Sequence, residues 1–370
     1  MKTRIEYAGI ALISGLLLLI NCTWGLPNQT RLDLIGGKSV LQANLQAINQ
    51  AKNKAKQIGT ANLTYQERLH FSVREFLISP FAGDDNFTLN AIRNLNPYKL
   101  KLDPHFYMYG GGFIYTGALF LQLSAWLGFT KLIPQADYYL QNPQALGNIF
   151  AILRIMVVVF ATAGLTFAYH LARIHFGRTT ALLTTAILIS TPLVHQASRT
   201  IEPHIFVLPF FLVAFYFIVL FAQHTQAKHL FLSALFSGFS VGIQALSIYI
   251  SIAFLVTLIY HYNTHHQNIC QIICSILVYG TIAAIAGLAL NPYYVLNFDG
   301  FMNDFTRGTG NQLLNTFKPW APFQLSAFLL GLFFIALIYH LLQSTKDIFT
   351  KLALSCTITS IPIYIFIANY

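Results

Sequence analysis

The chain has 370 residues, of which 55% are hydrophobic, 15% aromatic and only 9% charged, and its mean hydropathy is +0.57. A soluble domain of ordinary composition carries about 25% charged residues, so this composition excludes a water-soluble globular protein and indicates an integral membrane protein. The net charge of +10 does not indicate nucleic acid as a partner, because the Lys and Arg residues form short clusters between apolar runs and not one basic face.

Apolar runs of membrane-spanning length follow one another along the chain. A transmembrane helix needs roughly 20 apolar residues. The sequence therefore predicts an all-α integral membrane protein, a multi-span bundle of about 8–10 helices that forms a single membrane domain over residues 1–370. The stretch 230–260 is compatible with one bent span or with two shorter ones. The predicted spans are Tyr7–Leu26, Gly111–Ile133, Leu146–Ala172, Thr180–His195, Ile205–Gln223, Leu230–Leu246, Ser247–Tyr260, Ile269–Leu290, Phe323–Leu342 and Leu352–Ala368.

The amino terminus has features of both a signal peptide and a first span. Lys2 and Arg4 precede an apolar run that ends in Asn21-Cys22, as in a lipoprotein signal peptide. Cleavage before a lipid-modified cysteine requires a small residue where Asn21 stands, and the run is long enough to span with Trp24 at the interface. We predict a retained first helix, with the signal peptide as the alternative.

Charge sets the expected orientation. If Lys2 and Arg4 stay in the cytoplasm, residues 27–109, the only long polar segment, form a first extracytoplasmic loop, which we expect to carry juxtamembrane helices. The segments 198–204 and 291–322 then fall on the same outer face. Three basic clusters are expected in the cytoplasm: Arg173–Arg178, His224–His229 and Lys346–Lys351.

If residues 27–109 lie outside and Leu146–Ala172 runs from the outside to the inside, Gly111–Ile133 cannot be a simple crossing as well. Three glycines at 110–112 and the flanking aromatic residues suit a helix that lies in the interface. We therefore predict that this segment lies along or partly within the outer interface.

Metal and disulfide chemistry has little support in the sequence. The four cysteines stand within or beside apolar runs, which favours small core residues over a disulfide framework or a zinc site. His261, His265 and His266 are expected in a solvated cytoplasmic turn. No glycine-rich phosphate loop and no His-Glu-x-x-His helix is present.

Asp84-Asp85 is the only adjacent carboxylate pair in the chain, and it stands where the long outer loop returns to the bilayer. Such a pair can hold a metal, or it can raise the pKa of one carboxylate for acid–base work. The structural alternative is that both residues cap a helix over Phe87–Leu95.

The surrounding residues resemble a known family. Coverage of the resemblance runs from the first helix to about residue 305. The motifs are Gly83-Asp84-Asp85-Asn86-Phe87, Leu102-Asp103-Pro104-His105-Phe106-Tyr107, Arg154, Ala172-Arg173 with Phe176-Gly177-Arg178, Ser190-Thr191-Pro192, Ser198-Arg199, Glu202-Pro203-His204, Leu290-Asn291-Pro292-Tyr293 and Phe301. Together they are similar to the polyprenyl-phosphate-sugar-dependent glycosyltransferases of the GT-C type, such as protein O-mannosyltransferases and the enzyme that adds aminoarabinose to lipid A.

The resemblance implies a function and its residues. A sugar would move from a polyprenyl-phosphate donor to an acceptor hydroxyl on a lipid, glycan or protein, in a bacterial inner (plasma) membrane, with the active site facing the periplasm or exterior. Asp84 takes the position of the catalytic base, and Asp33 is the second choice. Asp85 stands where Glu is commoner, which leaves open whether it binds substrate or a divalent metal such as Mg or Mn. The other substrate-binding candidates are Arg199, Glu202, His204, Asn291 and Tyr293.

Several of these residues have a purely structural interpretation. Arg199 suits an interfacial anchor to lipid phosphates, and His204 a hydrogen-bonded first residue of a helix. Asn291 and Tyr293 stand where Pro292 stops a span in an aromatic belt. For Glu202 a functional role is favoured over a structural one, because a lone acid at a membrane edge is uncommon.

Two other functions remain open. A transporter or lipid flippase would show membrane-buried ionisable residues and broken helices in two matching halves, and the sequence has no internal repeat. A non-catalytic membrane subunit would keep the fold without the chemistry. The chain is short for the resembled family, so a truncation at the carboxyl end is also expected.

Overall fold

The structure is a computed structural model that describes residues 2–20, 22–265, 268–304 and 306. The predicted spans Phe323–Leu342 and Leu352–Ala368 lie outside the described residues. Within the described ranges the named elements are all helical, which confirms the predicted all-α membrane fold. The α-helices are α1 Lys2–Leu19, α2 Gln29–Leu34, α3 Gly37–Ile58, α4 Tyr65–Ile78, α5 Asp84–Asn94, α6 Gly111–Trp126, α7 Ala136–Gln141, α8 Pro143–Phe176, α9 Arg178–Ser190, α10 Pro192–Arg199, α11 Pro203–Phe206, α12 Leu208–His224, α13 Ala227–Ile243, α14 Ile250–His265, α15 Ile269–Leu290 and α16 Tyr293–Leu296.

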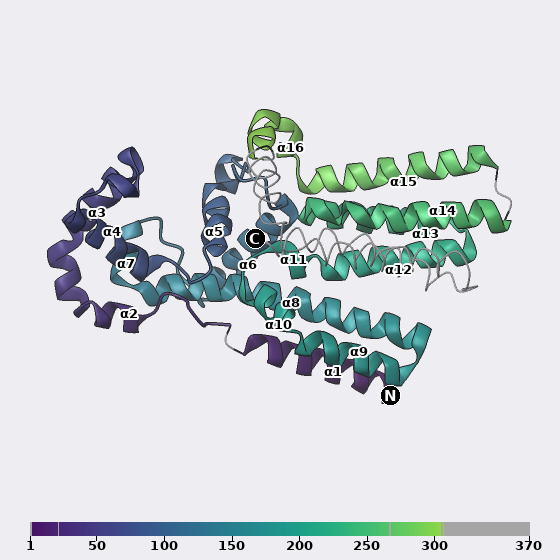
Figure 1. Cartoon of the computed structure of the whole chain (residues 1–370), viewed down its shortest axis with the longest axis horizontal. Coiled ribbons are helices and arrows are strands. Elements are labelled where there is room, and N and C mark those ends of the chain that lie inside the picture. Colours follow the sequence, from purple (N-terminus) through teal and green to yellow (C-terminus); the bar gives the residue numbers. More distant parts are fainter. Residues whose placement is uncertain (1, 21, 266–267, 305, 307–370) are drawn as a thin grey trace, which may run out of the picture.

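The long helices run beside one another along the long axis of the molecule (Figure 1). Helix α8 packs against α1, α9 and α12, and α13 packs against α12 and α15. The amino terminus lies at one end of this bundle, whereas α2–α5, α11 and α16 lie at the other end, which we call the Asp84 end. Segments 27–109, 198–204 and 291–304 therefore gather at one end, as the sequence predicts.

Helix α8 forms the centre of the main core. Its apolar residues Phe150, Leu153 and Val157 are fully buried against Phe113 of α6 and Phe206 of α11. With 34 residues α8 is about 50 Å long, whereas the hydrocarbon layer is about 30 Å thick. The helix is therefore long enough to cross a membrane and also to support the polar layer at the Asp84 end.

Three helical segments among the described residues are long and apolar enough to cross a membrane, namely Pro143–Phe176, Pro203–His224 and Ile269–Leu290. They correspond to three predicted spans. The stretch 230–260 forms two helices, α13 and α14, which are apolar but shorter. The predicted span Tyr7–Leu26 forms α1, which starts earlier and ends at Leu19.

The predicted span Thr180–His195 is not one straight helix. It breaks between α9 and α10 with a bend of 58°, so this pair makes a fourth crossing only if it counts as one bent span. Pro192 explains the break, because proline offers no N–H to the preceding turn and forces Thr191 into an extended conformation. The bend places α10 against both α8 and α1.

The amino-terminal end of the bundle carries an ionic cluster. Glu6 of α1 accepts hydrogen bonds from Arg173 Nη1 and Arg178 Nε, each at 2.9 Å, and from the Tyr169 hydroxyl. Helix α1 also buries Leu18 in the core beside α8. The first helix is thus an integral part of the bundle, and its basic end lies beside the predicted cytoplasmic cluster Arg173–Arg178.

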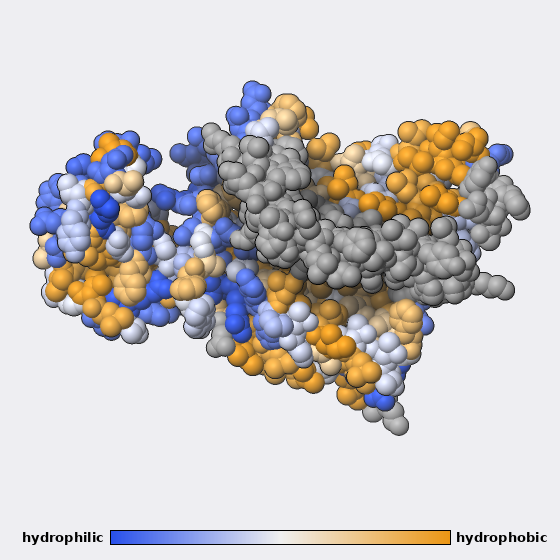
Figure 2. Space-filling view, viewed as in Figure 1, coloured by the Kyte–Doolittle hydropathy of each residue, from blue (hydrophilic) through white to orange (hydrophobic). Residues whose placement is uncertain are grey.

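Helices α2–α4 form a layer with a small core that they share with α7, whereas α5 packs in the main core. Leu41 and Ile48 of α3 pack with Leu77 of α4 and Leu140 of α7. Helix α4 begins with a capping box in which Thr64 and Glu67 exchange hydrogen bonds. Polar surface is more extensive on this layer, although apolar patches are present, whereas apolar residues cover much of the bundle (Figure 2), which is the distribution expected if the bundle crosses the membrane and the layer does not.

The segment predicted to lie in the interface has both ends at the Asp84 end. The Gly110 N–H donates to Ile243 O at 3.0 Å, and Ile133 N–H donates to the Tyr139 hydroxyl at 2.9 Å, just before α8 begins. A Cβ on Gly110 would lie 2.1 Å from Gly242 O, so this glycine permits a close approach to the end of α13. The sequence did not reveal this packing role. The depth of α6 in the interface stays a prediction.

Candidate active site

Asp84 and Asp85 open α5 but point into different surroundings. Asp84 is exposed, whereas Asp85 is fully buried. The residue that caps α5 is Gly83, and no side chain supplies a capping hydrogen bond. The alternative that both carboxylates cap this helix is therefore wrong, although their charge in the first turn still suits the helix dipole.

Asp85 forms a buried ion pair with Arg154 of α8. Its Oδ2 accepts from Arg154 Nη2 at 2.7 Å and from Nε at 3.3 Å, and its Oδ1 accepts from the Ile201 N–H at 2.7 Å. Arg154 Nη1 also donates to Cys22 O at 3.0 Å and to Trp24 O at 2.8 Å. Burial raises the pKa of the Asp85 carboxyl, and the Arg154 charge opposes that shift. This pair therefore joins α5, α8 and the chain that follows α1.

The segment after α10 is fixed to α5 from both sides. Besides the bond from Ile201 N–H to Asp85, the buried Thr88 hydroxyl donates to Ile201 O at 2.8 Å. Both peptide groups of Ile201 are thus satisfied by α5, and the next residue, Glu202, is placed beside Asp84. The polar residues of segments 27–109 and 198–204 are brought together in this way.

Glu202 is the titratable group most changed by its surroundings. Burial, followed by the charges of Asp84 and Asp85 and a hydrogen bond with Asp84, raises the pKa of Glu202 from 4.5 to about 7. A hydrogen bond between two carboxyl groups requires a proton on one of them. With its pKa raised to about 7, Glu202 can keep a proton near neutral pH and donate it in the hydrogen bond to Asp84, which is an arrangement suited to proton transfer.

His204 lies between Glu202 and a residue that sequence reasoning missed. Its Nε2 is 3.3 Å from Glu202 Oε2, and Gln244 Nε2 donates to its Nδ1 at 2.7 Å. This orientation suits a neutral imidazole that donates from Nε2 to Glu202. Gln244 directly follows α13, and its polar side chain at the end of an apolar helix was the available signal.

Tyr109 is a second residue that the sequence did not assign to the site. Its pKa is raised by burial and by the charges of Glu202, Asp84 and Asp85, so its hydroxyl stays protonated beside the carboxylates. Because its ring packs edge-on against Phe106 and Phe113, it forms an apolar wall next to the acidic pair.

Arg199 is the last residue of α10. Its charge acts on Cys22, which lies beside the ion pair of Asp85 and Arg154. The Arg199 Nε is buried, and it has no hydrogen-bond partner among the residues that the structure describes. A buried guanidinium donor without a partner is costly, so this geometry suits a bound anion, either a phosphate of the substrate or the phosphate of a membrane lipid.

Neither Asn291 nor Tyr293 forms a hydrogen bond with Asp84 in the part of the chain that the structure describes. The buried Asn291 accepts from the Gly111 N–H and donates to Gly242 O at 2.8 Å and to Gly287 O at 3.3 Å. All of its polar atoms are thus used to join α6, α13 and α15, which is a structural role. The Tyr293 side chain is half-buried, and its recorded interaction is with Tyr115.

Asp33 also lies apart from this site. It is exposed on α2, where Gln29 Nε2 donates to its Oδ1 at 3.1 Å. A separate polar cluster, not predicted from the sequence, joins the end of the first loop to the chain beyond α16. Its members are Asp103, Tyr107, Asn297 and Asp304.

The described residues contain no group of three or more His, Cys, Asp and Glu side chains that could hold a metal ion. Both oxygens of Asp85, the candidate metal ligand, already have protein partners. The metal and substrate roles of Asp85 stay predictions that this geometry does not favour.

Part of the sequence matches the model of a known protein family. Residues 134–289 match the family described as dolichyl-phosphate-mannose-protein mannosyltransferase. The match confirms the resemblance to glycosyltransferases of the GT-C type, and it supports a membrane glycosyltransferase that uses a lipid-linked sugar donor and an acceptor. The matched segment contains Arg154, Arg199, Glu202 and His204, whereas Asp84 precedes it. No curated protein and no solved structure matches the chain.

A pH-dependent stability is expected from Glu202. Its pKa is 4.5 in an unfolded chain and about 7 when folded, so the folded protein binds more protons between these values and loses stability as pH rises. The loss is on the order of 1–3 kcal/mol. Glu202→Gln should remove it, so thermal unfolding of the purified variant should vary less than that of the wild type between pH 5 and 8. Glu75→Gln at the same end should behave as the wild type. Equal pH dependence of wild type and Glu202→Gln would contradict the shifted pKa.

Proposed function

We propose that this protein transfers a sugar from a polyprenyl-phosphate donor to an acceptor hydroxyl on the extracytoplasmic face. The observation that supports this most is the exposed Asp84 carboxylate beside Glu202, at the end of an apolar bundle where a lipid donor and a polar acceptor can meet. The match of residues 134–289 supports the same class of reaction.

In the proposed reaction the acceptor hydroxyl oxygen attacks the anomeric carbon of the sugar. The bond between that carbon and the phosphate oxygen breaks, and its electron pair leaves with the polyprenyl phosphate. The hydroxyl proton passes to Asp84, which acts as the general base. Glu202 donates its own proton in the hydrogen bond to Asp84, so after the transfer the pair carries two protons and one of them leaves to solvent before the next cycle.

Arg199 is the proposed partner of the leaving phosphate. Negative charge grows on that phosphate as the bond to the sugar breaks, and a guanidinium placed beforehand stabilises this charge. The buried Nε without a partner in the described part of the chain supports this role. His204 is proposed to position Glu202, and Asp85 with Arg154 to position α5. We assign no step to a divalent metal, because both carboxylate oxygens of Asp85 already accept hydrogen bonds from Arg154 and Ile201.

The proposed location is a bacterial inner (plasma) membrane, with the Asp84 end facing the periplasm or exterior. Ser39 on α3 and Thr179 on α9 are both exposed and lie at opposite ends of the bundle. In intact cells Ser39→Cys should react with a membrane-impermeant thiol reagent, and Thr179→Cys should react only after the membrane is opened. The reverse labelling would place the Asp84 end in the cytoplasm and refute this orientation.

The test of the function is transfer itself. Membranes that contain the chain, incubated with a panel of polyprenyl-phosphate sugars labelled in the sugar, should move label from the donor into a lipid, glycan or protein fraction. Membranes without the chain are the control. Label that stays on the donor for every sugar and every fraction would count against a transferase.

A further inference from the structure

A cavity of about 710 Å³ lies on the side of α5 that faces α6 and the start of α8. This volume is in the range of sites that hold small ligands, about 300–1,000 Å³. Its walls are largely apolar and include Leu121, Ile133 and Phe150. Asp84 does not line it, so the cavity is separate from the proposed transfer site.

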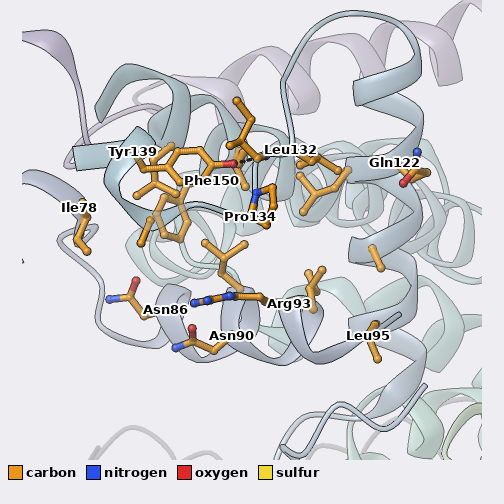
Figure 3. Close-up of a pocket in the computed structure, with 18 of the residues that line it drawn as sticks. Ile78, Asn86, Asn90, Arg93, Leu95, Gln122, Leu132, Pro134, Tyr139 and Phe150 are labelled. Carbon is orange, nitrogen blue, oxygen red and sulfur yellow. Dashed lines mark hydrogen bonds between the residues drawn. The ribbon is translucent and has the colours of Figure 1, made fainter. Parts of the chain in front are cut away.

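The polar lining comes mainly from one face of α5. Asn86, Asn90 and Arg93 are spaced at four and three residues, which places them on the same side of this helix. The Arg93 side chain points into the cavity (Figure 3). No hydrogen bond or ion pair to it is recorded among the described residues.

Further cations stand around Arg93. Burial lowers the pKa of Lys52, and the charges of Arg74 and then Arg93 lower it further, so the three cations lie within electrostatic reach of one another. Arg74 lines the cavity and is paired with Glu75, and Asp137 is the other acid near Lys52. Lys56 also lowers the pKa of Lys52, so four cations face two acids, and Arg93 is left with unused donors that attract an anion.

The cavity is continuous with an apolar surface. Leu119 and Leu132 line it and are also exposed, by 54% and 43%. The adjoining Trp126, Leu127 and Phe129 are each at least 70% exposed. Exposed apolar residues in such a row are expected to contact lipid and not water. A molecule can therefore enter this cavity from the bilayer.

We propose that this cavity binds one anionic phospholipid, whose acyl chain lies between α5, α6 and α8 and whose phosphate contacts Arg93. The charge of the lining complements the phosphate, and the apolar rim provides the path for the chain. The lipid would hold α5, and with it Asp84, from the side opposite to the ion pair of Asp85 and Arg154. This site does not depend on the proposed transfer reaction.

The test is lipid binding by the purified full chain, measured by native mass spectrometry after exchange with dioleoyl phosphatidylglycerol or dioleoyl phosphatidylcholine. The wild type should bind one phosphatidylglycerol about tenfold more tightly than phosphatidylcholine, which corresponds to about 1.4 kcal/mol. Arg93→Gln should remove that preference. Lys99→Gln, which removes the same charge from an exposed residue outside the cavity, should leave it unchanged.

A second variant tests the place of the acyl chain. Ala118 lines the cavity on α6, so Ala118→Trp should fill it and reduce binding of both lipids, whereas inorganic phosphate should not displace the phospholipid from the wild type. Arg93 is exposed, so Arg93→Gln should fold even if Ala118→Trp does not. Equal binding of the two lipids by the wild type, an unchanged preference in Arg93→Gln, or displacement by inorganic phosphate would each overturn the proposal.

Discussion

Asp84→Asn should abolish measurable sugar transfer while leaving the protein folded. Loss of a general base typically lowers the rate by about 10²–10⁴-fold. Asn has nearly the volume of Asp, and its amide oxygen still accepts the hydrogen bond from a protonated Glu202. Because Asp84 is exposed and caps no helix, the variant should unfold at the temperature of the wild type. The measurement is the initial rate of transfer in membranes with equal amounts of each protein.

The control for this variant is Asp33→Asn, which makes the same change in the same polar layer. The Asp33 carboxylate lies on α2, where it accepts a hydrogen bond from Gln29, so this variant should transfer at the rate of the wild type. Full activity in a well-folded Asp84→Asn protein would remove Asp84 as the base and move that role to Glu202. Loss of activity in Asp33→Asn alone would instead favour the second candidate of the sequence.

Arg154→Met should destabilise the protein more than any other single change considered. It leaves the fully buried Asp85 carboxylate without its ion pair, and it leaves Cys22 O and Trp24 O without their donor. Removing one partner of a buried ion pair costs about 3–5 kcal/mol. The expected result is a large fall in the temperature of unfolding in detergent, or a loss of folded protein from the membrane.

The double variant Asp85→Asn with Arg154→Met tests the cause of that loss. It removes both charges and keeps an oxygen that accepts from the Ile201 N–H, so it should recover part of the lost stability. Arg154→Lys keeps the charge but can form fewer of the four hydrogen bonds that Arg154 donates. Its unfolding temperature should therefore lie between those of Arg154→Met and the wild type. If Arg154→Met unfolds at the temperature of the wild type, the ion pair does not hold α5, α8 and the end of α1 together.

Most of the bundle could be predicted from apolar runs alone. The runs at Leu146–Ala172, Ile205–Gln223 and Ile269–Leu290 became long helices because twenty apolar residues have few other stable conformations in a bilayer. The break at Pro192 carried a local signal too, although hydrophobicity alone suggested one straight span. Packing of Gly110 against Gly242 carried no signal, because it depends on two segments that meet only in the fold.

The site was predictable as a set of residues but not as an arrangement. Arg154 stands inside an apolar run, where a lone cation indicates a buried partner, yet Asp85 is 69 residues away and no spacing rule connects them. Likewise, the sequence suggested Asn291 as a substrate contact, but its polar atoms are used within the fold.

The central claim is that this chain cleaves a lipid-linked sugar from its carrier and does not only move or hold it. The most direct measurement uses purified protein in liposomes with a donor that is labelled in the sugar and, separately, in the polyprenyl phosphate. The account predicts that the two labels separate, with free polyprenyl phosphate released at the rate at which sugar appears on the acceptor, and that Asp84→Asn stops both. Labels that cross the bilayer together on an intact donor would show a flippase, and an intact donor that stays in place with every acceptor would show a membrane subunit without this chemistry.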